Sequence, residues 1–188
     1  MDTAARLFTT HGVHAVGLQQ IIDECHCGKN LLYREFASKD DLIVAYLQRC
    51  HQSWLCTVKH ATESASGNPA GQLVAIVKAV AKQTTAAGAR GCPLRNTHAE
   101  FPDPDHPAHR VAVEHFASVR AQLLNLARQT GAADPATLAD RIMLIVDGLY
   151  TNGVVFGNTA AATAIRFAEE VVAAAIQPTA DRRATLAN

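Results

Sequence analysis

Apolar residues recur every three or four positions along most of this chain, which is the spacing of one face of an α-helix. Similar spacing predicts helices over residues 2–11, from residue 69 to about 87, around 112–126, from 135 to about 157, and around 164–175. A short helix is expected to begin at Pro93, since proline suits the first helical turn. The clearest stripe continues from residue 38 to about residue 62 and consists of Ile43, Leu47, Cys50, Trp54, Val58 and Ala61. The pattern predicts an all-α protein.

Two short helical patterns meet at a tight turn between residues 17 and 36. Leu18, Ile21 and Ile22 form the apolar side of the first, and Leu32 and Phe36 that of the second. Two helices joined at an angle by a turn of three or four residues form a helix-turn-helix, whose second helix lies in the DNA major groove. That helix carries side chains that can donate to phosphates or base edges: Lys29, Asn30, Tyr33 and Arg34.

The segments AARLF, HGVHAVGLQQII and GKNLLYREFASKDDL follow one another in residues 4–42. In this order and spacing they resemble the DNA-binding domain of the TetR family of bacterial repressors. The resemblance implies an N-terminal three-helix helix-turn-helix domain over residues 1–46. A C-terminal helical ligand-binding and dimerisation domain is then expected over residues 47–188. By the same resemblance we expect a homodimer joined through the last two long helices, bound to a palindromic double-stranded DNA operator and released by a small effector that is apolar.

The expected DNA contacts lie on the second and third helices of the head. Lys29, Asn30, Leu31 and Arg34 remain for DNA once Leu32 and Phe36 face the core, and Leu31 suits a thymine methyl group. Tyr33 and Lys39 match positions that touch phosphates in the family. Gln19, on the helix before the turn, completes the set of expected contacts. For Arg34, a solvated helical face is an equally weighted alternative.

Effector contacts are expected on the helices after residue 50. Trp54 lies on the helix that leaves the head, although a lone tryptophan is more often part of a core. Asp147 stands in apolar company, and it would bond either a ligand or a neighbour across the dimer interface. The full set of expected ligand-binding residues is Trp54, Cys92, Asn96, Phe116, Asp147 and Tyr150.

Composition narrows the cellular setting. The 188 residues are 48% hydrophobic but only 5% aromatic, which predicts a sizeable and mostly aliphatic core. No run of about 18 apolar residues predicts a membrane span, and the first residues do not resemble a secretory signal. Cytoplasmic residence is therefore expected, and the odd number of cysteines, five, favours reduced thiols.

The charge of the head is unusual for a DNA-binding segment. Residues 1–50 carry five Lys or Arg against six Asp or Glu, and the whole chain has a net charge of zero. DNA-binding modules are usually basic, although helix N-termini also bind phosphate. We therefore expect either a basic arm upstream of Met1 or weak DNA binding.

Cys25-His26-Cys27, at the turn of the helix-turn-helix, is a candidate metal motif that the spacing does not support. Two thiolates and an imidazole in three consecutive residues cannot close a tetrahedral site alone. By the family resemblance Cys25 and Cys27 are expected to pack in the core as small apolar thiols. His26 takes the place of a usual glycine, where the backbone can be left-handed.

Three other functions remain open from the sequence. The same head could respond to thiol oxidation at Cys92, or to a metal held by the histidine-rich segment that includes His98, His106 and His109. The chain could also be a helical ligand-binding protein that no longer binds DNA. An enzyme is least favoured, because no nucleophile elbow, phosphate loop or spaced metal motif is present. No cofactor and no metal ligands are expected.

Overall fold

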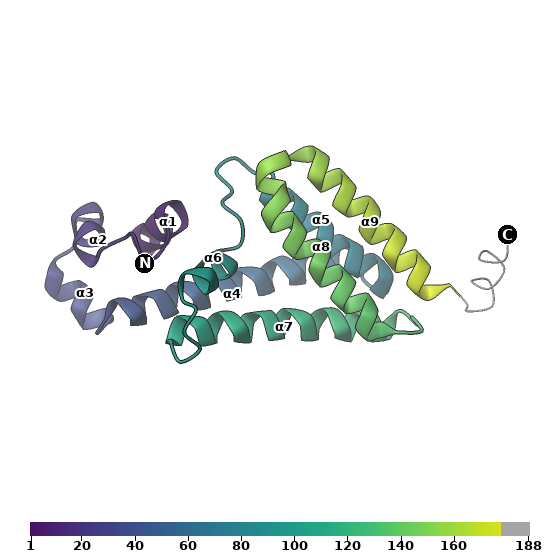
Figure 1. Ribbon diagram of the computed structural model, residues 1–188, viewed down its shortest axis with the longest axis horizontal. Coiled ribbons are helices and arrows are strands. Elements are labelled where there is room, and N and C mark those ends of the chain that lie inside the picture. Colours follow the sequence, from purple (N-terminus) through teal and green to yellow (C-terminus); the bar gives the residue numbers. More distant parts are fainter. Residues whose placement is uncertain (178–188) are drawn as a thin grey trace. The chain divides into compact units, whose positions relative to one another are not determined.

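The computed structural model describes residues 1–177 and confirms the all-α prediction: nine helices and no strand in that range (Figure 1). The helices are α1 (Asp2–His11), α2 (Leu18–Cys25), α3 (Lys29–Glu35), α4 (Lys39–Glu63), α5 (Pro69–Thr84), α6 (Pro93–Glu100), α7 (Pro107–Gln129), α8 (Pro135–Phe156) and α9 (Asn158–Ile176). Within residues 1–177, none of them combines the length and the apolar character that a membrane crossing requires.

Local chemistry explains where several helices begin and end. Gly12 ends α1 with φ of 86°, a left-handed backbone that glycine adopts without a Cβ penalty. The side chains of Ser38, Asn68 and Asp134 accept hydrogen bonds from backbone N–H groups at the starts of α4, α5 and α8. Pro107 is the first residue of α7, where its missing N–H has no helical partner to lose.

The chain forms two compact units. Unit 1 contains Met1–Trp54 and Cys92–Phe116, and unit 2 contains Leu55–Gly91 and the described residues from Ala117 to 177. The division falls inside α4 and α7, so each of these helices contributes a part to each unit. These units are defined by packing, and their boundaries differ from the domains over residues 1–46 and 47–188 that the family resemblance implies.

The core of unit 1 holds the three short helices of the head against the first half of α4. Aliphatic side chains from each helix and from the α1–α2 loop are buried, and the ring centroids of Phe8 and Tyr46 lie 5.4 Å apart. The Tyr46 hydroxyl lies 3.0 Å from Thr9 Oγ1. Because α3 has only seven residues, it depends on this packing for its stability. The buried set is Ala4, Leu7, Phe8, Val13, Val16, Ile21, Ile22, Leu32, Leu42, Ile43, Tyr46 and Leu47.

In unit 2, α5, α8 and α9 pack against one another, and Figure 1 shows α9 (yellow) beside α8 (green) and α5. A Cβ added at Gly153 of α8 would lie 2.5 Å from Thr84 Oγ1 of α5, so glycine is what permits this close approach. Two ion pairs connect helices of this unit, one between α5 and α9 and one between α7 and α8. Lys78 Nζ lies 2.9 Å from Glu169 Oε1, and Arg120 Nε lies 2.6 Å from Asp140 Oδ1.

Candidate functional site

The helix-turn-helix presents one buried and one exposed side. Ile21 and Ile22 of α2 and Leu32 of α3 are buried, so the core fixes the faces that these helices turn outward. The outward face of α3 holds two large apolar side chains, Leu31 and Tyr33, each 44% exposed. Such exposure on a short helix indicates a surface that binds a partner.

The structure gathers most of the predicted DNA-binding residues on this one face. Lys29, Asn30 and Arg34 are exposed beside Leu31 and Tyr33 on α3. The Lys29 ammonium lies 5.7 Å from the centre of the Tyr33 ring, a cation–π distance. Arg34 Nη2 lies 3.4 Å from Glu35 Oε1, a neighbour that offsets its charge.

The two other predicted DNA contacts lie on different elements. Gln19 is exposed on the second residue of α2, and its amide donates to Asp23 Oδ1 at 2.8 Å. Lys39 is the first residue of α4, and its Nζ donates to the His14 carbonyl oxygen at 3.3 Å. Lys39 therefore ties the start of α4 to the α1–α2 loop.

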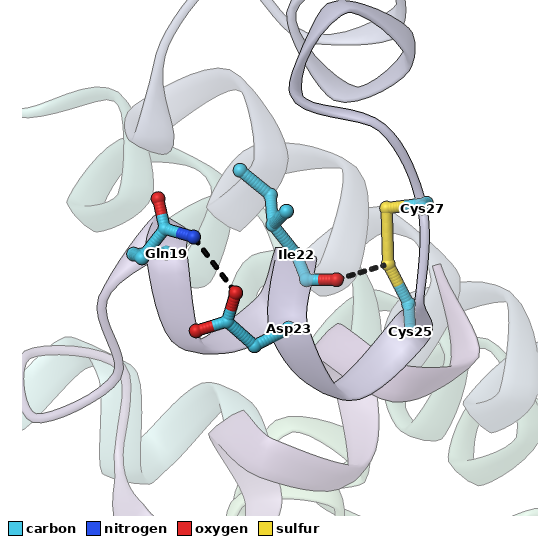
Figure 2. Close-up of a disulfide and its surroundings, with 5 residues drawn as sticks. All are labelled: Gln19, Ile22, Asp23, Cys25 and Cys27. Carbon is cyan, nitrogen blue, oxygen red and sulfur yellow. Dashed lines mark hydrogen bonds between the residues drawn. A yellow bond between two sulfur atoms is a disulfide. The ribbon is translucent and has the colours of Figure 1, made fainter.

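The expectation that Cys25 and Cys27 are buried, reduced thiols is wrong. The two residues form a disulfide across the turn, and both are only half-buried (Figure 2). The reason lies in His26, whose φ of 50° and ψ of 31° are left-handed. This conformation holds the two Cα atoms 5.2 Å apart, within the range that a disulfide requires.

Glu100, at the end of α6, binds the α1–α2 loop of the head. Its Oε1 accepts from the Val13 N–H at 3.2 Å and its Oε2 from the His14 N–H at 2.8 Å. The His14 ring nitrogen Nε2 lies 2.8 Å from the Glu100 carbonyl oxygen. No local sequence pattern predicts this contact, because His14 and Glu100 are 86 positions apart.

Phe101 extends this contact as the middle ring of a stack. Its ring centroid lies 4.4 Å from that of His14 and 4.2 Å from that of His106, with interplanar angles of 29° and 20°. His106 Nε2 is also 3.6 Å from Asp40 Oδ2, at the start of α4. We call Glu100, Phe101 and His106 the latch, since within unit 1 they join the α6–α7 segment to the head.

Rings from α4 and α7 form a second cluster in unit 1. His51 Nδ1 lies 2.9 Å from His115 Nδ1, and the Trp54 ring meets the His115 ring edge-on at 6.1 Å between centroids. Burial lowers the pKa of His115 to about 4, and the nearby His51 and Arg95 add to this shift. At neutral pH the His115 ring is therefore neutral, so the contact is a hydrogen bond in which one ring donates to the other.

The predicted ligand-binding residues fall into both units. Trp54 and Cys92 are buried in unit 1, Phe116 is half-buried there, and the Arg95 guanidinium lies 3.9 Å from the Phe116 ring centre. Asn96 is exposed on α6. In unit 2, Asp147 and Tyr150 are half-buried on α8.

An apolar groove of about 780 Å³ runs between α8 and α9 within unit 2. Its lining includes Leu144 and Phe167, which are 70% and 52% exposed. Phe156, which also lines the groove at the end of α8, is 63% exposed, and Val155 beside it in sequence is 70% exposed. Apolar side chains exposed to this degree along two helices indicate an interaction surface.

Metal ligands are not clustered in the part of the chain that the structure describes. There, no group of three or more His, Cys, Asp or Glu side chains could hold an ion. The histidines of the α6–α7 segment are engaged with rings and carbonyl groups instead. His109 Nδ1, for example, lies 2.8 Å from the Phe101 carbonyl oxygen.

The three-helix head, its exposed third helix and the helical body define a helix-turn-helix transcriptional regulator. Residues 1–46 match the family described as bacterial regulatory proteins, tetR family. The chain is 31% identical to SCO4454, a TetR-family transcriptional regulator from Streptomyces coelicolor. The match has a TM-score of 0.89 and covers 94% of this chain and 93% of SCO4454. The chain belongs to the TetR family of transcriptional regulators, which bind DNA and act as dimers.

Two further relatives agree with this assignment. A putative TetR transcriptional regulator, sav143 from Streptomyces avermitilis, is 26% identical with a TM-score of 0.71, over 89% of this chain and 94% of that one. The HTH-type transcriptional activator FasR of Mycolicibacterium smegmatis is 34% identical over 65 residues, which are 35% of this chain and 30% of FasR. All three relatives are regulators of transcription, in agreement with the expectation that the chain is not an enzyme.

Proposed function

We propose that this protein is a cytoplasmic, ligand-responsive repressor that binds a palindromic DNA operator as a homodimer. The exposed face of α3, backed by the buried Leu32, is the observation that carries the proposal. In a two-fold dimer, two such helices would enter successive major grooves, about 34 Å apart. Residues 1–46 would serve as the DNA-binding domain and residues 47–188 as the ligand-binding and dimerisation domain.

In this proposal each DNA contact has a distinct role. Asn30 and Arg34 read base edges, and Leu31 packs on a thymine methyl group. Lys29, Tyr33 and Lys39 bind phosphates and fix the position of the head, together with Gln19 on α2. The cation–π contact between Lys29 and Tyr33 supports this role for the pair, because it keeps both polar ends on the same exposed face.

The effector would be a small apolar molecule with a hydrogen-bond acceptor. Trp54 is 6% exposed, and its Nε1 is buried without a hydrogen-bond partner among the described residues. Burying an N–H group without a hydrogen-bond partner costs about 1–3 kcal/mol. A ligand acceptor that bonds to the Trp54 N–H would recover part of this free energy when the ligand binds. The proposed contacts in unit 1 are Trp54, Cys92, Asn96 and Phe116, and ligand contacts of Asp147 and Tyr150 in unit 2 are a separate prediction.

We infer that the latch transmits effector binding to DNA. Asn96 and Cys92 lie on or beside α6, whose last residue, Glu100, binds the backbone of the α1–α2 loop. An effector that favours a different position of α6 would release or move this loop. The effector must bind one arrangement more tightly than the other, because only differential affinity shifts the population.

The dimer would form through α8 and α9. The exposed Leu144, Phe156 and Phe167 and the groove between the helices support this choice, since burial of apolar area drives association.

Selection of operator DNA from a random duplex library tests the proposal. A palindrome should be enriched, and affinity should fall as salt rises, because bound phosphates release counterions. Lys29→Ala should lower the salt slope by about one unit, whereas Lys59→Ala, at an exposed position of α4, should leave the slope unchanged. Enrichment of no sequence would reject the proposal.

Activation is a second candidate outcome, because FasR is named a transcriptional activator. A promoter that carries the selected operator, transcribed in vitro with and without the protein, separates the two. Repression lowers the amount of transcript, and activation raises it.

A further inference from the structure

The turn of the helix-turn-helix is closed by a covalent bond. Cys25 is the last residue of α2, and Cys27 directly precedes Gly28, the N-terminal cap of α3. Figure 2 shows the two sulfur atoms joined on one side of the turn. The bond therefore spans the connection that sets the direction of α3 relative to α2.

The disulfide restricts the shape of this connection. Residues two apart in an extended chain have Cα atoms about 7 Å apart, which exceeds the span of a disulfide. In this turn the distance is 5.2 Å, and His26 between the cysteines is left-handed. His26 is also the one non-glycine residue with positive φ within residues 1–177. Without the bond, the turn could reach extended shapes that a non-glycine residue prefers.

The same bond is open to attack by a thiol. Cys25 and Cys27 are half-buried, and His26 between them is exposed. The other thiols differ in access: Cys92 is buried, Cys50 is half-buried, and Cys56 is exposed. Burial raises the pKa of Cys50 to about 11, so its thiol stays protonated and unreactive at neutral pH.

The reduced turn has a ready hydrogen-bond acceptor. Cys25 Sγ lies 3.6 Å from the Ile22 carbonyl oxygen (Figure 2). A disulfide sulfur carries no proton, so this contact becomes a hydrogen bond only when Cys25 is a thiol. The reduced form of Cys25 can therefore remain at the end of α2 while Cys27 moves away with the turn.

We propose that Cys25 and Cys27 form a reversible redox site that controls the order of the recognition helix α3. A thiolate of a small-molecule or protein dithiol attacks one sulfur, forms a mixed disulfide and expels the other cysteine as a thiolate, which takes up a proton. The second thiol of the reductant then displaces the remaining cysteine. The reductant leaves as a disulfide, and the protein has gained two electrons and two protons.

The oxidised form is the one in which α3 is ordered for DNA. Reduction lets His26 leave the left-handed region, so a smaller fraction of heads has α3 in the binding position. Apparent operator affinity falls in proportion to that fraction. The usual free-energy cost of one non-glycine residue in the left-handed region corresponds to a decrease in this affinity of about fivefold. The effect on DNA rests on the proposed function, whereas the order of α3 does not.

Two measurements on the full chain test the site without DNA. Mass spectrometry of alkylated protein that was first oxidised with a small-molecule disulfide should show Cys25 and Cys27 joined to each other, and the exposed Cys56 either alkylated or carrying the small molecule. After treatment with dithiothreitol all three should be modified. Hydrogen exchange of the α3 amides should then be faster in the reduced protein, with the amides of α5 unchanged.

Variants of the turn test whether the Cys25–Cys27 disulfide causes the difference in hydrogen exchange of α3. A Cys25→Ser and Cys27→Ser double variant should show fast α3 exchange in both conditions, and its operator affinity should equal that of the reduced protein. Cys56→Ser, at an exposed thiol outside the turn, should keep the full redox response. His26→Gly should show a smaller response, because glycine adopts the left-handed conformation without cost.

The outcomes separate this proposal from the proposed function. Alkylation of Cys25 and Cys27 in oxidised protein, or equal α3 exchange in both redox states, overturns the redox site. Redox-dependent exchange in a protein that selects no operator supports the redox site and rejects the proposed function. A change in exchange without a change in operator affinity overturns the claim that this site controls DNA binding.

Discussion

At the scale of the residue, His115 is a group whose protonation the fold opposes. It lies in unit 1 against His51 and Trp54, and burial lowers its pKa to about 4. In the unfolded chain an imidazole has a pKa of about 6.5. Between these two values the unfolded state binds more protons than the folded state, so stability falls as pH falls.

The free energy of unfolding should therefore decrease from about pH 6.5 down to about pH 4, by an amount on the order of 3 kcal/mol when the loss is complete. Urea unfolding at several pH values measures this slope. His115→Gln cannot be protonated and should flatten it, whereas His11→Gln, at an exposed position, should not. Equal slopes for the wild type and His115→Gln would contradict the prediction.

Glu100 is a second residue whose side-chain hydrogen bonds we expect to stabilise the fold. Its two carboxylate oxygens accept from two backbone N–H groups of the α1–α2 loop. Glu100→Gln replaces one acceptor with an NH₂ group that faces a donor. We expect a loss of about 1–2 kcal/mol in the free energy of unfolding, since hydrogen bonds to charged groups are the stronger ones.

Chemical denaturation measures this loss, with Glu114→Gln as the control because Glu114 is exposed on α7. In the proposed regulator, Glu100→Gln should also weaken the response of operator binding to the effector. A variant as stable as the wild type would show that the latch does not hold the loop.

At the scale of the element, the helices of the head are short and weakly capped. α2 has eight residues and α3 seven, and their N-terminal caps, Gly17 and Gly28, offer no side-chain acceptor. Both glycines have extended backbones, and a Cβ added at either meets no atom within 4 Å. Such helices owe their stability to tertiary packing, and for α3 also to the closed turn before it.

Gly17→Ser should stabilise the protein by about 0.5–1 kcal/mol, because serine caps α2 and restricts the unfolded chain. Gly17→Ala restricts the unfolded chain but cannot cap, so the difference between the two variants isolates the cap. Thermal and urea unfolding of both variants measure it. Gly17→Ser no more stable than Gly17→Ala would show that the cap contributes nothing.

At the scale of the whole molecule, the exposed apolar face of α8 and α9 determines the expected assembly. Leu144, at 70% exposure, lines the groove between these helices, and Arg141 and Asn152 contribute polar groups to its lining. If this face joins two copies, a charge placed on it must give up its hydration on dimerisation.

Leu144→Glu should raise the dimer dissociation constant at least about tenfold, which corresponds to about 1.4 kcal/mol. Sedimentation over a range of concentrations measures this constant. Val113→Glu, at a 44% exposed apolar position on α7, is the matched control and should leave the dimer intact. Dissociation by Val113→Glu rather than Leu144→Glu would assign the interface to another surface.

Much of the fold was predictable because helices depend on residues that are near one another in sequence. The stripe from Ile43 to Ala61 predicts most of α4, and Asp134 with Pro135 predicts the start of α8, since spacing and capping act within a few residues. The helix-turn-helix follows for the same reason. The exposed face of α3 follows once Leu32 is assigned to the core.

By itself, therefore, the sequence determined the all-α fold, the head and its family, through local spacing and a short ordered motif. Only the tertiary structure decided the pairing of Cys25 with Cys27, the contact of Glu100 with the α1–α2 loop, and the neutral state of His115. The first depends on which way two side chains point from a left-handed turn. The others depend on residues 86 and 64 positions apart that meet only when the chain is packed, and periodicity carries no information about such contacts.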